Sequence, residues 1–141
     1  MNTLNTSAIL VSRKVKFECT SRDNPAVMVD YTAPIGDGEG YTSLELFLVS
    51  LSTCAGSAMA LLLRKMHFEI TGLTVRATGE RRTEHPTCFH TILLDFGFVS
   101  PDLTEDAVKK ALALSEESIC PVWAMIKGNV TVNARFTISR S

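Results

Sequence analysis

Apolar and polar positions alternate near the amino terminus in the way that half-buried strands require. Val15, Phe17 and Cys19 are interleaved with charged residues, which is the two-residue period of a strand. Residues 21–25 (SRDNP) then predict a turn, and residues 26–32 a second strand of the same hairpin. The Gly- and Pro-containing run at 34–40 predicts a loop.

A long helix is predicted over residues 43–66. Thr42 or Ser43 could cap it, and Glu45 in the first turn suits the helix dipole. Residues 46–63 contain no charge and reach the lower length limit for a membrane span. Small and polar residues occupy the centre of this stretch, where a membrane span would be most apolar. We therefore favour a buried central helix over a membrane-inserted one.

Two lines of small residues run along this helix at a spacing of four. One line contains Ser50, Cys54 and Ala58, and the other contains Ser52, Gly56 and Ala60. Side chains four apart lie on one helix face, so both lines allow a neighbouring element to approach closely.

The carboxyl-terminal half predicts further strands at 73–78, 90–99 and 129–138. A second helix begins after Asp102 or Thr104, and Pro121 lies just past its end. Its expected buried stripe consists of Val108, Ala111, Leu112, Ser115 and Ile119. The predicted order is two or three strands, a helix, two strands, a helix and a strand. This order indicates one α+β domain over residues 1–141, with a mainly antiparallel sheet and a long buried central helix.

Composition supports a folded protein and narrows its partners. Of 141 residues, 45% are hydrophobic and 21% charged, which is enough for a core. The net charge of −1 gives no reason to expect nucleic acid as a partner. Near the amino terminus the basic residues follow a short apolar stretch, the reverse of a secretory signal, so we expect a cytoplasmic protein. The very apolar helix exceeds what a monomer needs, which favours a homodimer.

Two of the four cysteines have ordinary explanations. Cys19 faces inward from a predicted strand and acts as a small apolar residue. Cys88 lies between His85 and His90, but these three side chains point to different faces of a strand. The cysteines contain no CxxC pair, so we expect no metal site.

Cys54 and Cys120 are the candidates for chemistry. Cys54 lies within the small-residue tract of the long helix, where a ligand could approach. Cys120 follows the second helix and precedes Pro121, where unpaired backbone N–H groups can lower the pKa of a thiol. Taken alone, these features fit two reactive cysteines or two buried ones.

Three segments resemble the OsmC/Ohr family, in the same order along the chain. Residues 43–66 (SLELFLVSLSTCAGSAMALLLRKM) resemble its central helix, with Cys54 at the family's first cysteine. Residues 72–98 (GLTVRATGERRTEHPTCFHTILLDFGF) resemble the strand pair that follows. Residues 115–132 (SEESICPVWAMIKGNVTV) resemble its second cysteine motif, with Cys120 before Pro-Val. The resemblance spans residues 13–138 and implies an OsmC-like fold in an intertwined homodimer.

The resemblance implies thiol-dependent reduction of hydroperoxides in oxidative-stress defence, without a cofactor. Cys54 would attack the peroxide and become a sulfenic acid, and Cys120 would condense with it to a disulfide. An external dithiol would restore the pair. The family's arginine, which favours the thiolate, corresponds best to Arg22, with Arg13 as a weaker substitute.

The chain departs from the peroxidase branch at one position. That branch carries a glutamate ten residues before the first cysteine, where this chain has Leu44. Glu45 is one position later and points about 100° away on a helix, so it could assist Cys54 or serve only the helix dipole. The segment resembles a less characterised branch of the family. The alternative function is therefore the binding of an apolar small molecule at the dimer cleft without peroxidase turnover.

Apolar residues near the two cysteines could wall such a cleft or could belong to the core. They are Phe47, Leu51, Met59, Val122, Trp123 and Met125.

Overall fold

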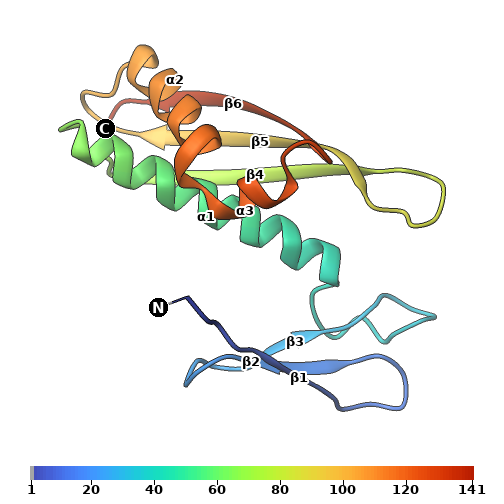
Figure 1. The fold of residues 1–141 in the computed structure, drawn as a ribbon. Coiled ribbons are helices and arrows are strands. Elements are labelled where there is room, and N and C mark those ends of the chain that lie inside the picture. The colour runs from blue at the N-terminus through green and yellow to red at the C-terminus, as the bar shows by residue number, and fades with distance from the viewer. Residues whose placement is uncertain (1) are drawn as a thin grey trace. The chain divides into compact units, whose positions relative to one another are not determined.

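The computed structural model describes residues 2–141, which form two compact units (Figure 1). The first unit ends at Phe47, and the second spans Leu48–Ser141. Each unit has a three-stranded sheet of its own, so the protein has two small sheets where we expected one. The α+β class is confirmed.

The first unit is a meander of three short antiparallel strands. Its strands are β1 (Ser7–Leu10), β2 (Phe17–Thr20) and β3 (Val27–Val29), in that spatial order. β2 and β3 are the predicted hairpin, and β1 adds a third strand to it. All four residues of β1 are exposed, and those of β2 and β3 are at most half-buried. The strands therefore enclose no core within this unit.

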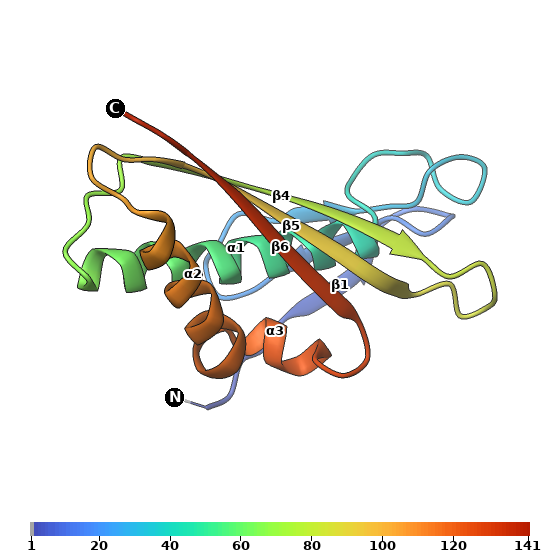
Figure 2. The ribbon, with the colours of Figure 1, turned by 90° about the horizontal axis from the view of Figure 1, so that it is seen from above.

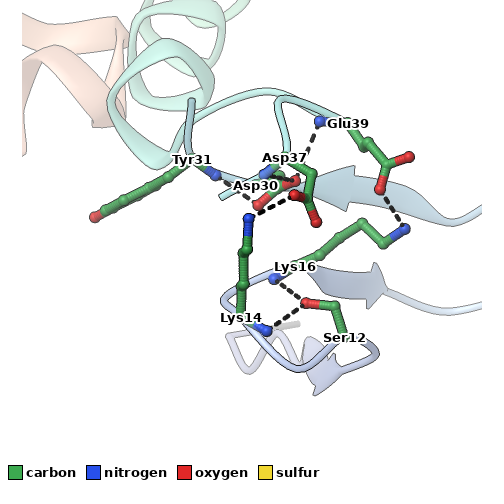
Figure 3. A network of polar contacts seen from close by, with 7 residues as sticks. All are labelled: Ser12, Lys14, Lys16, Asp30, Tyr31, Asp37 and Glu39. Carbon is green, nitrogen blue, oxygen red and sulfur yellow. Dashed lines mark hydrogen bonds and ion pairs between the residues drawn. The ribbon is translucent and has the colours of Figure 1, made fainter. Parts of the chain in front are cut away.

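One buried carboxylate organises the loop that follows β3 (Figure 3). Asp30 is almost completely buried and accepts hydrogen bonds from the backbone N–H groups of Tyr31, Asp37 and Glu39 at 2.8, 3.1 and 3.1 Å. Burial by itself would raise the pKa of Asp30, but the three N–H donors outweigh it and the pKa is lowered. A Cβ at Gly36 would collide with the Tyr31 carbonyl and the Asp30 carboxylate, so the loop closes only around glycine.

Two ion pairs connect the same loop with the segment between β1 and β2. Lys14 pairs with Asp37 at 2.8 Å, and Lys16 pairs with Glu39 at 3.1 Å (Figure 3). Exposed pairs of this kind contribute little individually. Asp30 is therefore the main polar anchor of the loop.

Replacing Asp30 with Asn is expected to lower the thermal midpoint at pH 7 by several degrees, because the ionised acceptor is lost. The folded pKa is lowered, so the stabilisation is fully present above the unfolded pKa of about 3.9 and is lost as pH falls through the folded pKa. The difference between wild type and variant should thus shrink below about pH 4. Thermal unfolding across pH measures it. Asp37→Asn, which removes only an exposed pair, is the control and should cause a small change.

The second unit is a sheet covered on one face by helices (Figures 1 and 2). Strands β4 (Gly72–Arg81) and β5 (Phe89–Val99) are antiparallel, and β6 (Thr131–Ser139) runs parallel to β5. The crossover from β5 to β6 contains α2 (Glu105–Leu114), a π-helical turn η1 (Ser115–Ile119) and α3 (Pro121–Ile126). Three of the four strand pairings in the two sheets are antiparallel, as the sequence predicts.

Helix α1 (Ser43–Lys65) has the predicted bounds to within one residue. Thr42 and Glu45 form a reciprocal capping box, in which each side chain accepts a hydrogen bond from the other residue's backbone N–H. Length and composition alone would allow α1 to cross a membrane. Its buried side chains, including Leu51, Met59 and Leu63, instead make it a core helix of the α+β fold.

Alternate residues of β5 supply the other side of this core. Ile92, Leu94, Phe96 and Phe98 are buried, whereas the residues between them are half-buried on the opposite face. This two-residue period is the signature of a sheet with one covered face.

The region after α2 differs from the prediction in two respects. The helix was expected to continue regularly with Ile119 on its buried stripe, but the turn widens at Ser115 and leaves Ile119 49% exposed. The short helix α3 was not predicted. Both differences concern the residues beside Cys120.

Candidate functional site

Helix α1 presents Cys54 on the first of its two small-residue lines. The second line faces β4, where a Cβ at Gly56 would lie 3.0 Å from the Val75 side chain. The small residues thus allow a neighbouring element to approach closely, as predicted, and that element is strand β4. Cys54 itself is half-buried.

Cys120 joins the π-helical turn to α3. Its backbone N–H donates to the Ser115 carbonyl at 2.9 Å, and its own carbonyl accepts from the Ala124 N–H at 3.0 Å. Pro121 occupies the first position of α3, where a missing N–H has no consequence. Cys120 is thereby fixed at a junction between two helical segments, with only 2% of its surface exposed.

The structure brings these two cysteines together across 66 residues of sequence. Both are free thiols, and the Cys120 S–H donates to the sulfur of Cys54 at a sulfur–sulfur distance of 3.1 Å. A disulfide has a bond length of about 2.05 Å. Small side-chain movements would therefore suffice to join the pair.

Burial raises the pKa of the Cys120 thiol to about 11. The backbone N–H groups of Trp123 and Val122 act in the opposite direction, and the hydrogen bond to Cys54 adds to the increase. Cys120 therefore keeps its proton at neutral pH. This property suits a partner thiol better than an attacking thiolate.

Because Cys120 is buried and protonated, iodoacetamide at pH 8 is expected to alkylate Cys54 well before Cys120 in wild-type protein. Modification of Cys120 should rise only as pH approaches about 11. Peptide mass spectrometry after timed quenching measures both rates. Cys88, which is exposed, provides a reference thiol in the same sample. Equal rates at Cys54 and Cys120 would contradict the assignment.

The thiol pair lines an open depression of about 450 Å³. Its lining residues come from α1 and from the turn at Cys120, and none of them is charged: Ser50, Thr53, Cys54, Ser57, Ala58, Leu61, Ile119, Cys120, Pro121 and Val122. Of the six expected wall residues, Val122 lines the depression. Leu51, Met59 and Trp123 are buried in the core instead. The sequence allowed both a cleft wall and the core for these residues.

Leu61 and Ile119 are lining residues that the sequence analysis did not identify as such. Leu61 continues the small-residue face of α1 seven positions after Cys54, and this spacing was a usable signal. Ile119 reaches the depression only because of the π-helical turn.

The other two predicted site residues lie in the first unit. Arg22 is exposed in the turn between β2 and β3, with a positive φ of 55°. Glu45 is exposed and its carboxylate accepts the Thr42 N–H at 2.8 Å, so it serves as a helix cap in this structure. Leu44 is half-buried.

One group of acidic residues among residues 2–141 could gather ligand atoms for a metal. Oxygen atoms of Asp30, Asp37 and Glu39 lie within 4.8 Å of one another. Backbone N–H groups already occupy Asp30, and Lys14 and Lys16 pair with the other two carboxylates. Because these carboxylates already have partners within the protein, the cluster serves to organise the loop and gives no support for a metal site.

The fold and the site define an α+β protein with two adjacent cysteines below an uncharged depression. A family model described as "OsmC-like protein" matches residues 36–135. Protein YhfA of Escherichia coli K12 is 30% identical over 95 residues, which cover 67% of this chain and 71% of YhfA. The chain therefore belongs to the OsmC-like protein family, as its sequence motifs predict.

Solved structures show the same fold. A hypothetical protein from Aquifex aeolicus VF5 matches with a TM-score of 0.87 and 24% identity, covering 100% of this chain and 99% of that one. An OsmC-like protein from Mycoplasma pneumoniae matches with a TM-score of 0.83 and 20% identity, covering 99% of both. The organic hydroperoxide resistance protein OhrB of Bacillus subtilis has a lower TM-score of 0.66 at 18% identity, covering 96% and 98%. The TM-scores are thus higher for the first two structures than for OhrB, which agrees with the resemblance of this sequence to a less characterised branch of the family.

Proposed function

We propose that this OsmC-like protein reduces hydroperoxides through the Cys54–Cys120 pair. The observation that carries the proposal is the hydrogen-bonded pair of free thiols, 3.1 Å apart, with one member half-exposed at an open depression. Membership of a family that includes organic hydroperoxide resistance proteins supports it. Oxidative-stress defence in the cytoplasm, where thiols are kept reduced, is the corresponding setting.

The proposed reaction has two oxidative steps. The Cys54 thiolate attacks the peroxide oxygen, the O–O bond breaks, and the alkoxide takes a proton to leave as an alcohol. Cys54 is then a sulfenic acid. The Cys120 sulfur displaces its hydroxyl, and the hydroxide takes the Cys120 proton to leave as water. An external dithiol is oxidised as it returns the disulfide to two thiols.

The half-exposure of Cys54 supports the attacking role for this residue, and the raised pKa and burial of Cys120 support the resolving role for the second thiol. Arg22 and Glu45 are proposed to assist Cys54, on the strength of the family resemblance alone. If Arg22 supplies the cation, Arg22→Met should slow the first step while Arg13→Met leaves it unchanged. Glu45→Gln should have a smaller effect, because its carboxylate already caps α1.

A direct experiment tests the proposal. Reduced protein is mixed with one equivalent of cumene hydroperoxide, and free thiols and intact mass are followed over time. We expect two thiols to be consumed, one pair of hydrogen atoms to be lost, and a peptide linking Cys54 to Cys120. Unchanged thiols after prolonged exposure would refute peroxidase activity.

A second candidate is the binding of an apolar small molecule without turnover. The uncharged lining of the depression and Leu44, at the place of the expected glutamate, favour it. A ligand retained in native mass spectrometry, together with Cys54 inert toward peroxide, would support this function over the first.

We also propose that residues 1–141 act as a single domain in an intertwined homodimer. Large apolar side chains of the first unit, such as Ile9, Leu10 and Val27, are exposed on strands that enclose no core. Unsupported strands of this size are marginal in water. Light scattering should therefore give about 31 kDa, twice the chain mass of 15.4 kDa. A mass near 15 kDa at micromolar concentration would contradict the dimer.

A further inference from the structure

The row of buried side chains along one face of α2 continues with Cys120, and Ile119 is not part of it. Val108, Ala111 and Ser115 are fully buried at spacings of three and four, so a regular helix would place position 118 or 119 next on that line. Instead the Cys120 N–H bonds to the carbonyl five residues earlier, at 2.9 Å, and the Cys120 side chain takes the buried place. The extra residue of the π-helical turn moves Ile119 outward.

Ile119 consequently stands in the wall of the thiol depression. It remains 49% exposed, although isoleucine is among the residues most often buried. Leu61, 63% exposed, contributes from α1 to the same depression. Single π-helical turns are rare and occur frequently at functional sites. The turn therefore accounts for both the buried thiol and the exposed apolar side chain beside it.

We propose that Ile119 is a specificity-determining residue, which forms with Leu61 an apolar rim that favours uncharged reactants over anionic ones at Cys54. The identity of the natural reactant rests on the function proposed above. The effect of the rim does not depend on the natural reactant, because it applies to any reagent that must pass Ile119 and Leu61 to reach the Cys54 sulfur.

Two alkylating reagents of nearly equal size test the rim without requiring peroxidase activity. Iodoacetamide is neutral and iodoacetate is an anion, so the ratio of their rates at Cys54 reports the charge preference of the site. The ratio is measured by peptide mass spectrometry in wild type, Ile119→Val, Ile119→Lys and Ile119→Glu. Exposed Cys88 is the internal control.

We expect Ile119→Lys to raise the iodoacetate rate at Cys54 about threefold to tenfold, and Ile119→Glu to lower it similarly, as one charge several ångströms away would do. The iodoacetamide rate should change far less. Ile119→Val should behave as wild type, and Cys88 should be unaffected in every variant. Equal rate ratios in all four proteins would overturn the proposal.

Light scattering of the same variants separates the rim from a subunit interface. The Lys and Glu variants should keep the wild-type molar mass, and a shift to a smaller species would overturn the proposal by placing Ile119 between subunits. In parallel, kcat/KM for cumene hydroperoxide relative to hydrogen peroxide should fall in Ile119→Lys. The expected alkylation pattern in a protein inert to peroxide would support the rim and refute the peroxidase function.

Discussion

A Cys54→Ser variant is expected to lose at least about a thousandfold in the rate of hydroperoxide reduction, because a serine hydroxyl ionises far less readily than a thiol and cannot form a sulfenic acid. Cys54 is half-buried and so the more exposed member of the pair, and its sulfur accepts the Cys120 S–H in the reduced protein. Apart from Cys54 and Cys120, no described cysteine or methionine lines the depression. Stopped-flow measurement of cumene hydroperoxide consumption under excess dithiol gives the rate.

Cys120→Ser is the matched variant, because it removes the second sulfur and leaves the first. The peroxide should still oxidise Cys54 in a single turnover, and a sulfenic acid should accumulate that dimedone captures. Cys19→Ser and Cys88→Ser should retain turnover, because neither residue lines the depression. If Cys54→Ser reacts as fast as wild type, the thiol mechanism is wrong.

Much of the fold followed from periodic patterns in the sequence. The candidate caps Thr42 and Ser43 and the uncharged run over residues 46–63 indicated the start and length of α1, because both are local signals in the sequence. Strand β5 was also predicted from the sequence, because its apolar run lies between polar connections. Patterns within one segment do not determine how strands from different segments are grouped, so the division into two sheets was missed.

The turn at Ser115 could not be predicted for a different reason. The stripe of α2 was extended with the α-helical period, and that period puts Ile119 inside. A π-helical turn adds one residue and exchanges Ile119 for Cys120, a change that no propensity or spacing of residues 115–120 indicates. Helix α3, with six residues, is too short to show a period.

The candidate site follows from residue types and family motifs together. Residue types alone allow Cys54 and Cys120 to be either reactive or simply buried, and only the resemblance to the family relates them as a pair. Their contact depends on the crossover from β5 to β6 returning Cys120 to α1, which is a property of the tertiary fold. The sequence does not predict the uncharged lining of the depression either, because Leu61 and Ile119 come to line the same depression only through that contact.

Phe96→Ala is expected to cost about 3–5 kcal/mol of unfolding free energy, the largest stability change among our predictions. Phe96 lies on the covered face of β5, is fully buried, and stacks on Phe98 with ring centroids 6.0 Å apart and 8° between planes. It is flanked in register by Val75 and Phe136 on the neighbouring strands, so its removal leaves a cavity bordered by rigid strands that cannot close around it.

Leu93→Ala on the opposite face of β5 is the control. Leu93 is half-buried and removing it opens no cavity in the core, so we expect a loss near 1 kcal/mol. Urea unfolding of wild type and both variants, under reducing conditions at pH 7, measures the difference. A small domain has only about 5–15 kcal/mol of stability in total, so Phe96→Ala should populate unfolded protein at moderate temperature while Leu93→Ala does not. Equal losses for the two variants would mean that the core does not lie on the helix-covered face, and the placement of Cys54 and Cys120 beside that core would then have to be revised.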